Sequence, residues 1–329
     1  MKKRLLILLL LAVFPVFLAG KTQKPDIKVG ILSDVHVREH KADSIFIKAL
    51  EYFKGCDVDA VMLVGDFTND GTEDQLENIA KDWFMVFPDD KGRRGKKVER
   101  IFVYGNHEME GTTYKEAITR YSQEYLDAHR IADHKAEYWE KYWHEPFDSL
   151  YKKEVKGYVF LAAHYNGKAE TPGMKEFFDK VGPALPKDKP VFYIQHKHPK
   201  WTIPWATDNG NSSRVLRDYP NLICFSGHCH NSLTDEKSIW QGKVTSVNTA
   251  SLKRLGTRSG HENTKVSKNK EGYVPQMPMH YCWDGHQGMV MEVFPDRVVL
   301  RRYDFHFDEY LGDWVIPNDV SRRPYDPKV

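Results

Sequence analysis

The sequence predicts an α/β fold with two sheets, and three observations support this prediction. In the first third of the chain, short apolar runs rich in β-branched residues alternate with segments of helical periodicity. Such alternation favours parallel strands joined by crossover helices. Apolar runs with polar ends follow in the second half, and a hairpin pattern lies near the C-terminus. From the residues alone, we expect one α/β domain with a second, more antiparallel sheet.

Three strands and two helices are predicted in the first third of the chain. The strands are expected within residues 27–34, 59–66 and 99–108. Between them, apolar residues recur at positions i, i+3, i+4 and i+7, which lie on one face of a helix. In the first helix these residues are Phe46, Ala49, Leu50 and Phe53, and in the second they are Leu76, Ile79, Ala80 and Trp83.

The remaining elements are predicted from the same two periodicities. An aromatic-rich helical segment is expected at 112–145, where Tyr114, Ala117, Ile118 and Tyr121 have helical spacing. Further strands are expected at 154–165, 189–199 and 221–230, and a hairpin with a Pro-Asp turn at 288–305. We expect a single domain at residues 25–315, followed by a short tail at 316–329.

The N-terminus has the layout of a secretory signal peptide. A short basic stretch, Lys2 to Arg4, precedes an apolar run, Leu5 to Leu18, that ends at Ala19-Gly20. This run is shorter than the roughly 20 residues that span a membrane, although an uncleaved anchor is the alternative interpretation. We therefore expect residues 1–20 to be removed and the protein to be exported, either to the periplasm or outside the cell. We expect no membrane span in the mature chain.

The charge of the chain gives no reason to expect binding to nucleic acid. The formal net charge is +2, and removal of the three cationic side chains of the signal peptide leaves −1. An excess of positive charge is what attracts a protein to nucleic acid or to an anionic membrane surface. The apparent basicity therefore belongs to the targeting segment.

Side chains of the types that bind metals follow five of the predicted strands. They are Asp34 and His36, then Asp66, then Asn106 and His107, then His196 and His198, and finally His228 and His230. In open α/β sheets, ligands gather beyond the carboxyl ends of the strands, where the exit loops converge. We therefore expect these side chains to meet at one site.

The composition of this set points to two transition-metal ions. Carboxylate oxygen, amide oxygen and imidazole nitrogen together suit Mn, Fe, Co, Ni or Zn. Seven of these side chains are counted as ligands: Asp34, His36, Asp66, Asn106, one of His196 or His198, His228 and His230. Seven ligands are too many for one tetrahedral ion, but they suit two ions that share one carboxylate. Two neighbouring metal ions can activate a hydroxide between them and stabilise an in-line displacement at phosphorus. Such a mechanism needs no serine nucleophile motif of the G-x-S-x-G type, and none is apparent.

These residues carry a resemblance to a known family. Asp34-x-His36, Gly65-Asp66, Gly105-Asn106-His107-Glu108, a histidine at 196 and Gly227-His228-x-His230 resemble the signature of the calcineurin-like metallophosphoesterases. The resemblance covers roughly residues 27–250, and the strand pattern near 288–315 resembles the closing strands of bacterial members, so the chain resembles an exported bacterial member. It implies a sandwich of two mixed β-sheets flanked by helices, with helices outside and sheets inside.

The resemblance also implies a role for each matching residue. One metal site would consist of Asp34, His36, Asp66 and His230, and the other of Asp66, Asn106, His196 and His228, with Asp66 bridging. His107 would be the catalytic histidine, which does not bind metal but stabilises the transition state or protonates the leaving oxygen.

Two positions depart from the family pattern. The fourth motif is QHKHP, in which two histidines compete for one role. We favour His196 as the ligand because it directly follows the apolar strand, and we place His198 near the substrate. Purple acid phosphatases carry a tyrosine three residues after the bridging aspartate, whereas this chain has Asn69 there. Iron–tyrosinate chemistry is therefore not expected, and the two ions could be Mn, Fe or Zn.

The predicted function is hydrolysis of a phosphate monoester or diester by a hydroxide that bridges two divalent metal ions. A non-hydrolytic, metal-dependent binding module on the same fold is the alternative, and His107 favours the enzyme because a scaffold has no need of it. The expected substrate is small and phosphorylated. It could be nucleotide-like if Trp201, Trp205 and the segment 279–288 form an aromatic wall, although these residues could equally pack between strands. No oligomeric state is predicted.

Overall fold

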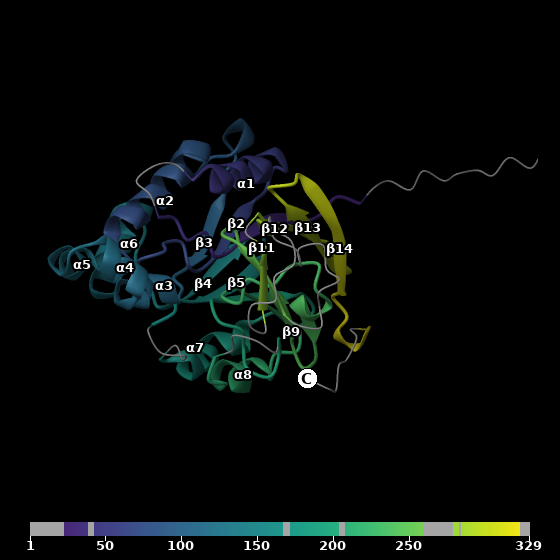
Figure 1. Ribbon diagram of the computed structural model, residues 1–329. Coiled ribbons are helices and arrows are strands. Elements are labelled where there is room, and N and C mark those ends of the chain that lie inside the picture. Colours follow the sequence, from purple (N-terminus) through teal and green to yellow (C-terminus); the bar gives the residue numbers. More distant parts are fainter. Residues whose placement is uncertain are drawn as a thin grey trace, which may run out of the picture.

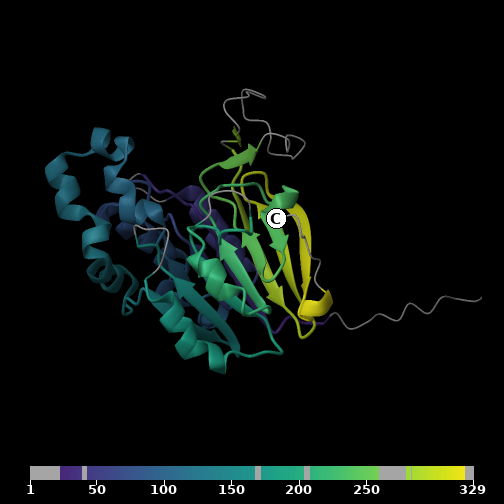
Figure 2. The same ribbon diagram turned by 90° about the horizontal axis from the view of Figure 1, so that it is seen from below.

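The computed structural model describes residues 23–38, 43–166, 172–203, 208–258, 279–282 and 284–322. Two six-stranded sheets pack against each other, and helices cover their outer faces (Figure 1, Figure 2). Helices α1 (Ser44–Gly55), α2 (Glu73–Val86) and α6 (Ile131–Trp143) lie on one side, and α7 (Met174–Val181) and α8 (Asn211–Leu216) lie on the other. The expected sandwich of two mixed sheets flanked by helices is confirmed.

The first sheet combines the N-terminal and C-terminal parts of the chain. Its strands, in the order β14-β13-β12-β1-β2-β3, are β14 (Glu309–Pro317), β13 (Arg297–Asp304), β12 (Gln287–Val293), β1 (Ile27–Leu32), β2 (Ala60–Val64) and β3 (Glu99–Val103). The pairs β1–β2 and β2–β3 are parallel, as the strand–helix alternation predicts. The C-terminal strands pair antiparallel and extend this sheet through β12 and β1.

The second sheet is mainly parallel, so the expectation that it would be the more antiparallel sheet was wrong. Its order is β4-β5-β6-β7-β9-β8, with β4 (Leu150–Val155), β5 (Tyr158–Ala163), β6 (Val191–Gln195), β7 (Leu222–Ser226), β9 (Thr245–Asn248) and β8 (Ile239–Gln241). Only the edge pairs β4–β5 and β8–β9 are antiparallel. The C-terminal hairpin pairs with the edge of β1 that β2 leaves open, and therefore joins the first sheet. A separate two-stranded sheet contains β10 (Leu255–Arg258) and β11 (Met279–Cys282).

Helices α1 and α2 have the buried faces that their apolar spacing predicts. The residues buried on α1 are Phe46, Ala49, Leu50 and Phe53, and those on α2 include Leu76, Ile79, Ala80 and Trp83. The Asp43 side chain caps α1 by accepting hydrogen bonds from the backbone N–H groups of Ile45 and Phe46 at 3.2 and 3.1 Å. The face of α1 packs so closely on β1 that a Cβ on Gly30 would overlap the Phe53 ring.

The segment 112–145 is not one helix but several short ones. They are α4 (Lys115–Arg120), α5 (Gln123–His129) and α6, and they follow α3 (Asn106–Glu110) and a 3₁₀ turn at Gly111–Thr113. The chain is extended at Tyr121, and the Ser122 side chain then caps α5 by accepting from Tyr125 N at 3.1 Å. Of the predicted helical face, Ala117 is buried but Ile118 is 53% exposed. The segment is helical as expected, but Tyr114 and Tyr121 lie at the two caps of α4, so the four residues with helical spacing do not share one helix.

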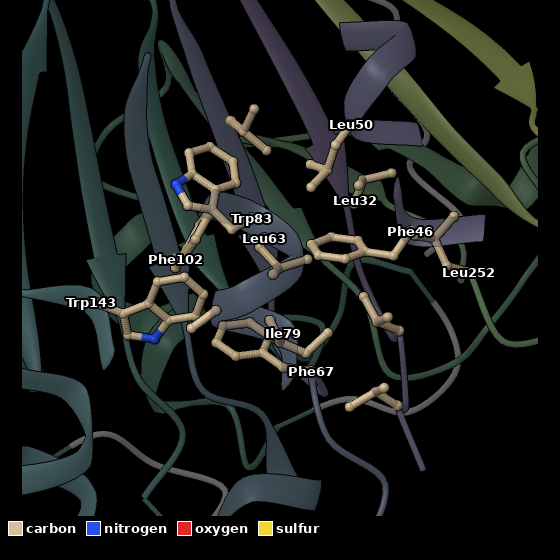
Figure 3. Close-up of a cluster of buried hydrophobic side chains, with 14 of the residues drawn as sticks. Leu32, Phe46, Leu50, Leu63, Phe67, Ile79, Trp83, Phe102, Trp143 and Leu252 are labelled. Atoms are coloured by element: carbon tan, nitrogen blue, oxygen red, sulfur yellow. The ribbon is translucent and has the colours of Figure 1, made fainter. Parts of the chain in front are cut away.

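Three apolar clusters fill the layers of the fold. One lies between the sheets and includes Ile31, Val64, Phe192 and Phe225. The second, shown in Figure 3, packs α1, α2 and α6 on the first sheet, with the rings of Trp83, Phe102 and Trp143 stacked edge to face. The third packs α7 and α8 on the second sheet. Short 3₁₀ helices also occur at Pro88–Asp90, Arg93–Gly95, Gly182–Ala184, Glu236–Ser238 and Val320–Arg322.

Candidate metal centre

The predicted ligands all lie in loops at the carboxyl ends of five strands. The loop after β1 carries Asp34 and His36, that after β2 carries Asp66, α3 after β3 begins with Asn106, the loop after β6 carries His196, and that after β7 carries His228 and His230. All are buried except His228, which is partly exposed. The parallel pairs β1–β2–β3 and β6–β7 bring their loops to one edge of each sheet.

The first group of potential ligands consists of Asp34, His36 and His230. His230 Nε2 lies 3.0 Å from Asp34 Oδ1 and 3.1 Å from His36 Nε2. His36 Nε2 is also 3.8 Å from Asp66 Oδ2. Two imidazole nitrogens and two carboxylate oxygens therefore converge on one point, which is the donor set expected for a transition-metal ion.

The second group consists of Asp66, His196 and His228. His196 Nε2 lies 3.0 Å from Asp66 Oδ2, and the rings of His196 and His228 are 5.2 Å apart between centroids. Asp66 thus belongs to this group while its Oδ2 also lies near His36 of the first. A carboxylate in that position could bridge two ions.

A buried oxygen without a hydrogen-bond partner supports metal binding at this site. Asn106 donates through Nδ2 to Tyr114 Oη at 3.0 Å, but its buried Oδ1 has no hydrogen-bond partner in the described part of the chain. A buried acceptor left without a donor is costly, so a cation that binds Asn106 Oδ1 would remove this cost.

Backbone carbonyls fix the ring orientation of two of the histidines. His196 Nδ1 lies 2.8 Å from Val64 O, and His230 Nδ1 lies 3.2 Å from Arg254 O. A carbonyl can only accept, so each Nδ1 carries the proton and leaves the Nε2 lone pair for a metal. Both Nε2 atoms point into the ligand groups described above.

Most of the predicted ligands have a left-handed backbone. Five predicted ligands have left-handed backbone angles, with φ of 53° at Asp34, 51° at His36, 54° at Asp66, 68° at His228 and 53° at His230. Positive φ is uncommon for residues other than glycine, although aspartate and histidine adopt it more readily than most. Such outliers gather at functional sites, where the surrounding structure holds them in place.

Two glycines allow the ligand loops to approach each other closely. Gly65 has a φ of 85°, and a Cβ there would overlap the His196 ring. A Cβ on Gly227 would overlap the Asp34 carboxylate. The backbone of His228 can therefore donate to Asp34 Oδ2 at 3.0 Å, which ties the loops of β1 and β7 together.

His107 lies beside both groups, and its ring contacts the backbone of Asn69. Its Nδ1 lies 2.5 Å from Asn69 O, and its ring packs edge to face on His36 with centroids 4.3 Å apart. Its backbone N–H donates to Asp66 Oδ1 at 2.9 Å. His36, Asp66 and His107 also have ligand atoms close enough to form a third potential group, so the assignment of His107 as a catalytic residue stays a prediction.

Glu108, to which the sequence reasoning assigned no role, supports the loops that carry the candidate ligands. Its buried carboxylate accepts from the backbone N–H groups of Asp66, Thr68 and Gly105 at 3.0, 2.7 and 2.7 Å, and from Thr68 Oγ1 at 2.9 Å. It thereby joins the loops of β2 and β3. The glutamate in the GNHE motif could have revealed it, because a carboxylate three residues after a glycine can cap the helix that follows.

His198 lies deeper than its predicted role near the substrate would suggest. The side chain is fully buried, with Nδ1 2.5 Å from Ser226 Oγ and Nε2 3.0 Å from Cys229 Sγ. Burial lowers the pKa of His198 to about 3. Both ring nitrogens are therefore occupied by protein groups, and the predicted contact with substrate has no support in this geometry.

The aromatic residues considered for a leaving-group wall are only partly described. Trp201 is 53% exposed and lines a pocket of about 240 Å³ together with Trp240. No candidate metal ligand lines that pocket. Trp205, Trp283 and the side chains of residues 279–282 lie outside the described part of the structure. The nucleotide-like substrate therefore stays a prediction.

Burial and neighbouring charges shift the pKa values of the ligands in opposite directions. Burial lowers the pKa of His36 and of His228 to about 3 in each case. Burial also acts to lower the pKa of His196, but the charge and hydrogen bond of Asp66 outweigh it and raise the pKa to about 9. Near neutral pH the metal-free site therefore holds His196 as the doubly protonated imidazolium, and His36 and His228 as neutral imidazoles.

Comparison with known proteins places the chain in a family. The profile of the calcineurin-like phosphoesterases matches residues 27–232. The chain therefore belongs to the calcineurin-like phosphoesterase family, and it is a hydrolase that acts on phosphate ester bonds. No curated protein sequence gives a significant match. No helix in the described ranges is both long and apolar enough to cross a membrane.

Solved structures share the fold at low sequence identity. A dimetal phosphatase from Danio rerio is 13% identical, with 90% of this chain and 100% of that chain covered and a TM-score of 0.52. The purple acid phosphatase PPD1 from yellow lupin is 13% identical, with 92% of this chain and 56% of that chain covered and a TM-score of 0.54. A structure of PhoD is 11% identical, with coverages of 90% and 70% and a TM-score of 0.53. At such identities the likeness shows the fold alone.

Proposed function

We propose that the protein hydrolyses a phosphate monoester or diester with two divalent metal ions. The observation that supports this most directly is the position of Asp66, which contacts His196 of one ligand group and faces His36 of the other. One ion would be held by Asp34, His36, Asp66 and His230, and the other by Asp66, Asn106, His196 and His228. When bound, the two ions would supply a hydroxide nucleophile between them and positive charge for the phosphoryl oxygens.

The protein residues around the ions have separate tasks in this proposal. Glu108 and the backbone N–H of His228 hold the carboxylate loops in position. His107, oriented through Asn69 O, would donate a proton to the leaving oxygen as its bond to phosphorus breaks. The products are an alcohol and a phosphate with one ester bond fewer. A small phosphorylated compound is the expected substrate class, and a nucleotide-like one is a narrower proposal.

Hydrolysis of two matched model substrates tests this function. The mature chain, loaded separately with Mn, Zn or Fe, is assayed with an aryl phosphomonoester and an aryl phosphodiester beside an Asp66→Asn variant. We expect turnover of at least one ester by the parent protein and its loss in the variant. Two bound ions with no turnover of either ester would instead support the non-hydrolytic binding module.

We also propose that the protein is exported after removal of residues 1–20. The support is the basic, apolar and small-residue order of the N-terminus. N-terminal sequencing of protein recovered from the periplasmic and culture fractions tests this. A chain that retains Met1 in the membrane fraction would indicate the uncleaved anchor.

A further inference from the structure

Lys197 carries a positive charge beside the metal centre that no acidic group in the described ranges pairs with. It lies in the loop after β6, directly after the predicted ligand His196, and is partly exposed. Its Nζ donates to Tyr165 Oη at 3.2 Å and lies 4.8 Å from the centre of the Tyr165 ring. An ammonium group has three N–H donors, and only one of them is used here by a described residue.

A continuous set of hydrogen bonds connects Lys197 to a predicted ligand of the second ion. Tyr165 Oη donates to Glu110 Oε1 at 2.7 Å, and Tyr114 Oη donates to Glu110 Oε2 at 3.2 Å. Tyr114 Oη in turn accepts from Asn106 Nδ2 at 3.0 Å. Every donor and acceptor in this series has a compatible role, so the ammonium of Lys197 is held at a fixed place relative to Asn106.

The groups that hold Lys197 leave its charge available. Burial raises the pKa of Tyr114 to about 12 and also raises the pKa of Tyr165, so both phenols stay neutral near neutral pH. Glu110 is shared between the two phenols and lies outside ion-pair distance of Lys197. A lysine tied to a phenol while having no carboxylate partner is suited to bind an anion from solution.

We propose that Lys197 binds an unesterified phosphoryl oxygen of the substrate and makes the site selective for phosphate monoesters over diesters. This inference rests on the proposed phosphoesterase function. A monoester carries a charge near −2 above its second pKa of about 6, whereas a diester carries −1. Because Coulomb attraction scales with charge, a fixed ammonium at the rim favours the monoester. Lys197 would thus be a specificity-determining residue.

The test compares Lys197→Gln with a matched control, Lys200→Gln. Lys200 lies three residues further along the same loop, with its ammonium over the Trp201 ring at 5.6 Å. For the Mn-loaded protein, kcat/KM is measured on an aryl phosphomonoester and on the matching methyl aryl phosphodiester. We expect Lys197→Gln to lower kcat/KM about tenfold on the monoester, the loss typical of one hydrogen bond to a charged group, and only about threefold on the diester, whose charge is half as large. Lys200→Gln should change neither value.

Other outcomes overturn the inference without touching the proposed function. An equal loss on both esters would mean that Lys197 only supports the fold, and no loss would mean that it does not contact substrate. Lys197→Arg should keep the preference for the monoester, because the positive charge remains.

A binding measurement separates failure of the inference from failure of the function. If the parent protein hydrolyses neither ester, the proposed function fails, and binding of inorganic phosphate and of dimethyl phosphate to the Mn-loaded protein is measured by calorimetry instead. We expect Lys197→Gln to lower the affinity for inorganic phosphate by about tenfold and to lower the affinity for dimethyl phosphate much less. Equal affinities in the parent and the variant would show that Lys197 binds no phosphoryl group.

Discussion

Glu108 Oε2 accepts a hydrogen bond from the backbone N–H of Asp66 at 3.0 Å, and this bond ties the loop after β3 to the candidate bridging ligand. The same oxygen accepts from Gly105 N, and Oε1 accepts from both donors of Thr68. Asp66 has a left-handed backbone, and its Oδ1 accepts from the backbone N–H of His107 at 2.9 Å. Its carboxylate is therefore positioned from the neighbouring strand, through a residue that would not touch either ion.

Substitution of Glu108 by glutamine should weaken metal binding. The amide has one oxygen and one nitrogen, so it cannot accept from the four donors that the carboxylate satisfies, and the Asp66 loop loses part of its support. Loss of a group that orients metal ligands typically costs about 10–100-fold in affinity. Metal titration of Glu108→Gln checks this, with the exposed Glu116→Gln on α4 as the control. Unchanged affinity in Glu108→Gln would show that the loop holds its shape without the carboxylate.

Substitution of His107 should separate catalysis from metal binding. If its imidazole acts on the leaving oxygen, His107→Asn should lower kcat by about 10²–10⁴-fold, the range of a positioned acid or base, while both ions remain bound. If His107 is a ligand of the third potential group, the variant should bind fewer ions. Elemental analysis together with the rate on an activated aryl ester distinguishes the two outcomes.

The fold could be predicted where the apolar residues follow a single periodicity, either that of a strand or that of a helix. The strands β1, β2 and β3 and the buried faces of α1 and α2 follow from alternating apolar runs and i, i+3, i+4 spacing. The position of the C-terminal hairpin could not be predicted in this way, because the choice between two sheets depends on which strand edge is free. The breaks within 112–145 depend on a side-chain cap at Ser122, which outweighs the helical spacing of the aromatic residues around it.

The candidate site was visible in the sequence because ligands at strand ends leave a local pattern. The local bond from Gly105 N to Glu108 leaves a pattern in the GNHE motif, but the contacts between distant residues leave none. The hydrogen bonds between Asp66 and Glu108, and from Lys197 through Tyr165 to Glu110, join residues 32 to 55 positions apart in the chain. Only the fold brings these distant partners together, so a motif cannot reveal these bonds.

Metal binding should weaken as the pH falls below about 9. Asp66 raises the pKa of His196 to about 9 in the metal-free protein, so an ion that binds His196 Nε2 at neutral pH must displace a proton. The pKa values of His36 and His228, each lowered to about 3, mean that these rings are already neutral and do not compete. Affinity should fall by about tenfold per pH unit for each proton displaced.

Calorimetry in two buffers of different ionisation enthalpy measures this proton release directly. We expect protons to be released on metal binding at pH 7, and much less release at a pH above the pKa of His196. Metal retention that does not change down to about pH 4 would contradict the assignment of histidine ligands.

His164 should make the protein less stable in acid. Its ring is fully buried among Trp139, Phe147 and Tyr104, and its Nδ1 accepts from Tyr104 N at 3.0 Å, which requires that nitrogen to be unprotonated. Burial lowers the pKa of His164 to about 3, whereas an unfolded chain titrates near 6.5. Between these values the unfolded state binds the extra proton, so the free energy of unfolding should fall with falling pH, by about 1.4 kcal/mol per pH unit from this group.

The variant His164→Asn isolates this contribution, because its amide oxygen can accept from Tyr104 N but does not titrate. Urea unfolding of the parent protein and of the variant, between about pH 6.5 and pH 4.5, should give a shallower loss of stability for the variant. His144→Asn is the control, because His144 is an exposed residue with a left-handed backbone that asparagine tolerates. A parallel loss of stability in the parent protein and in His164→Asn would contradict this prediction. The buried ring would then take up its proton without global unfolding, through a local opening of the aromatic rings of Trp139, Phe147 and Tyr104 around it.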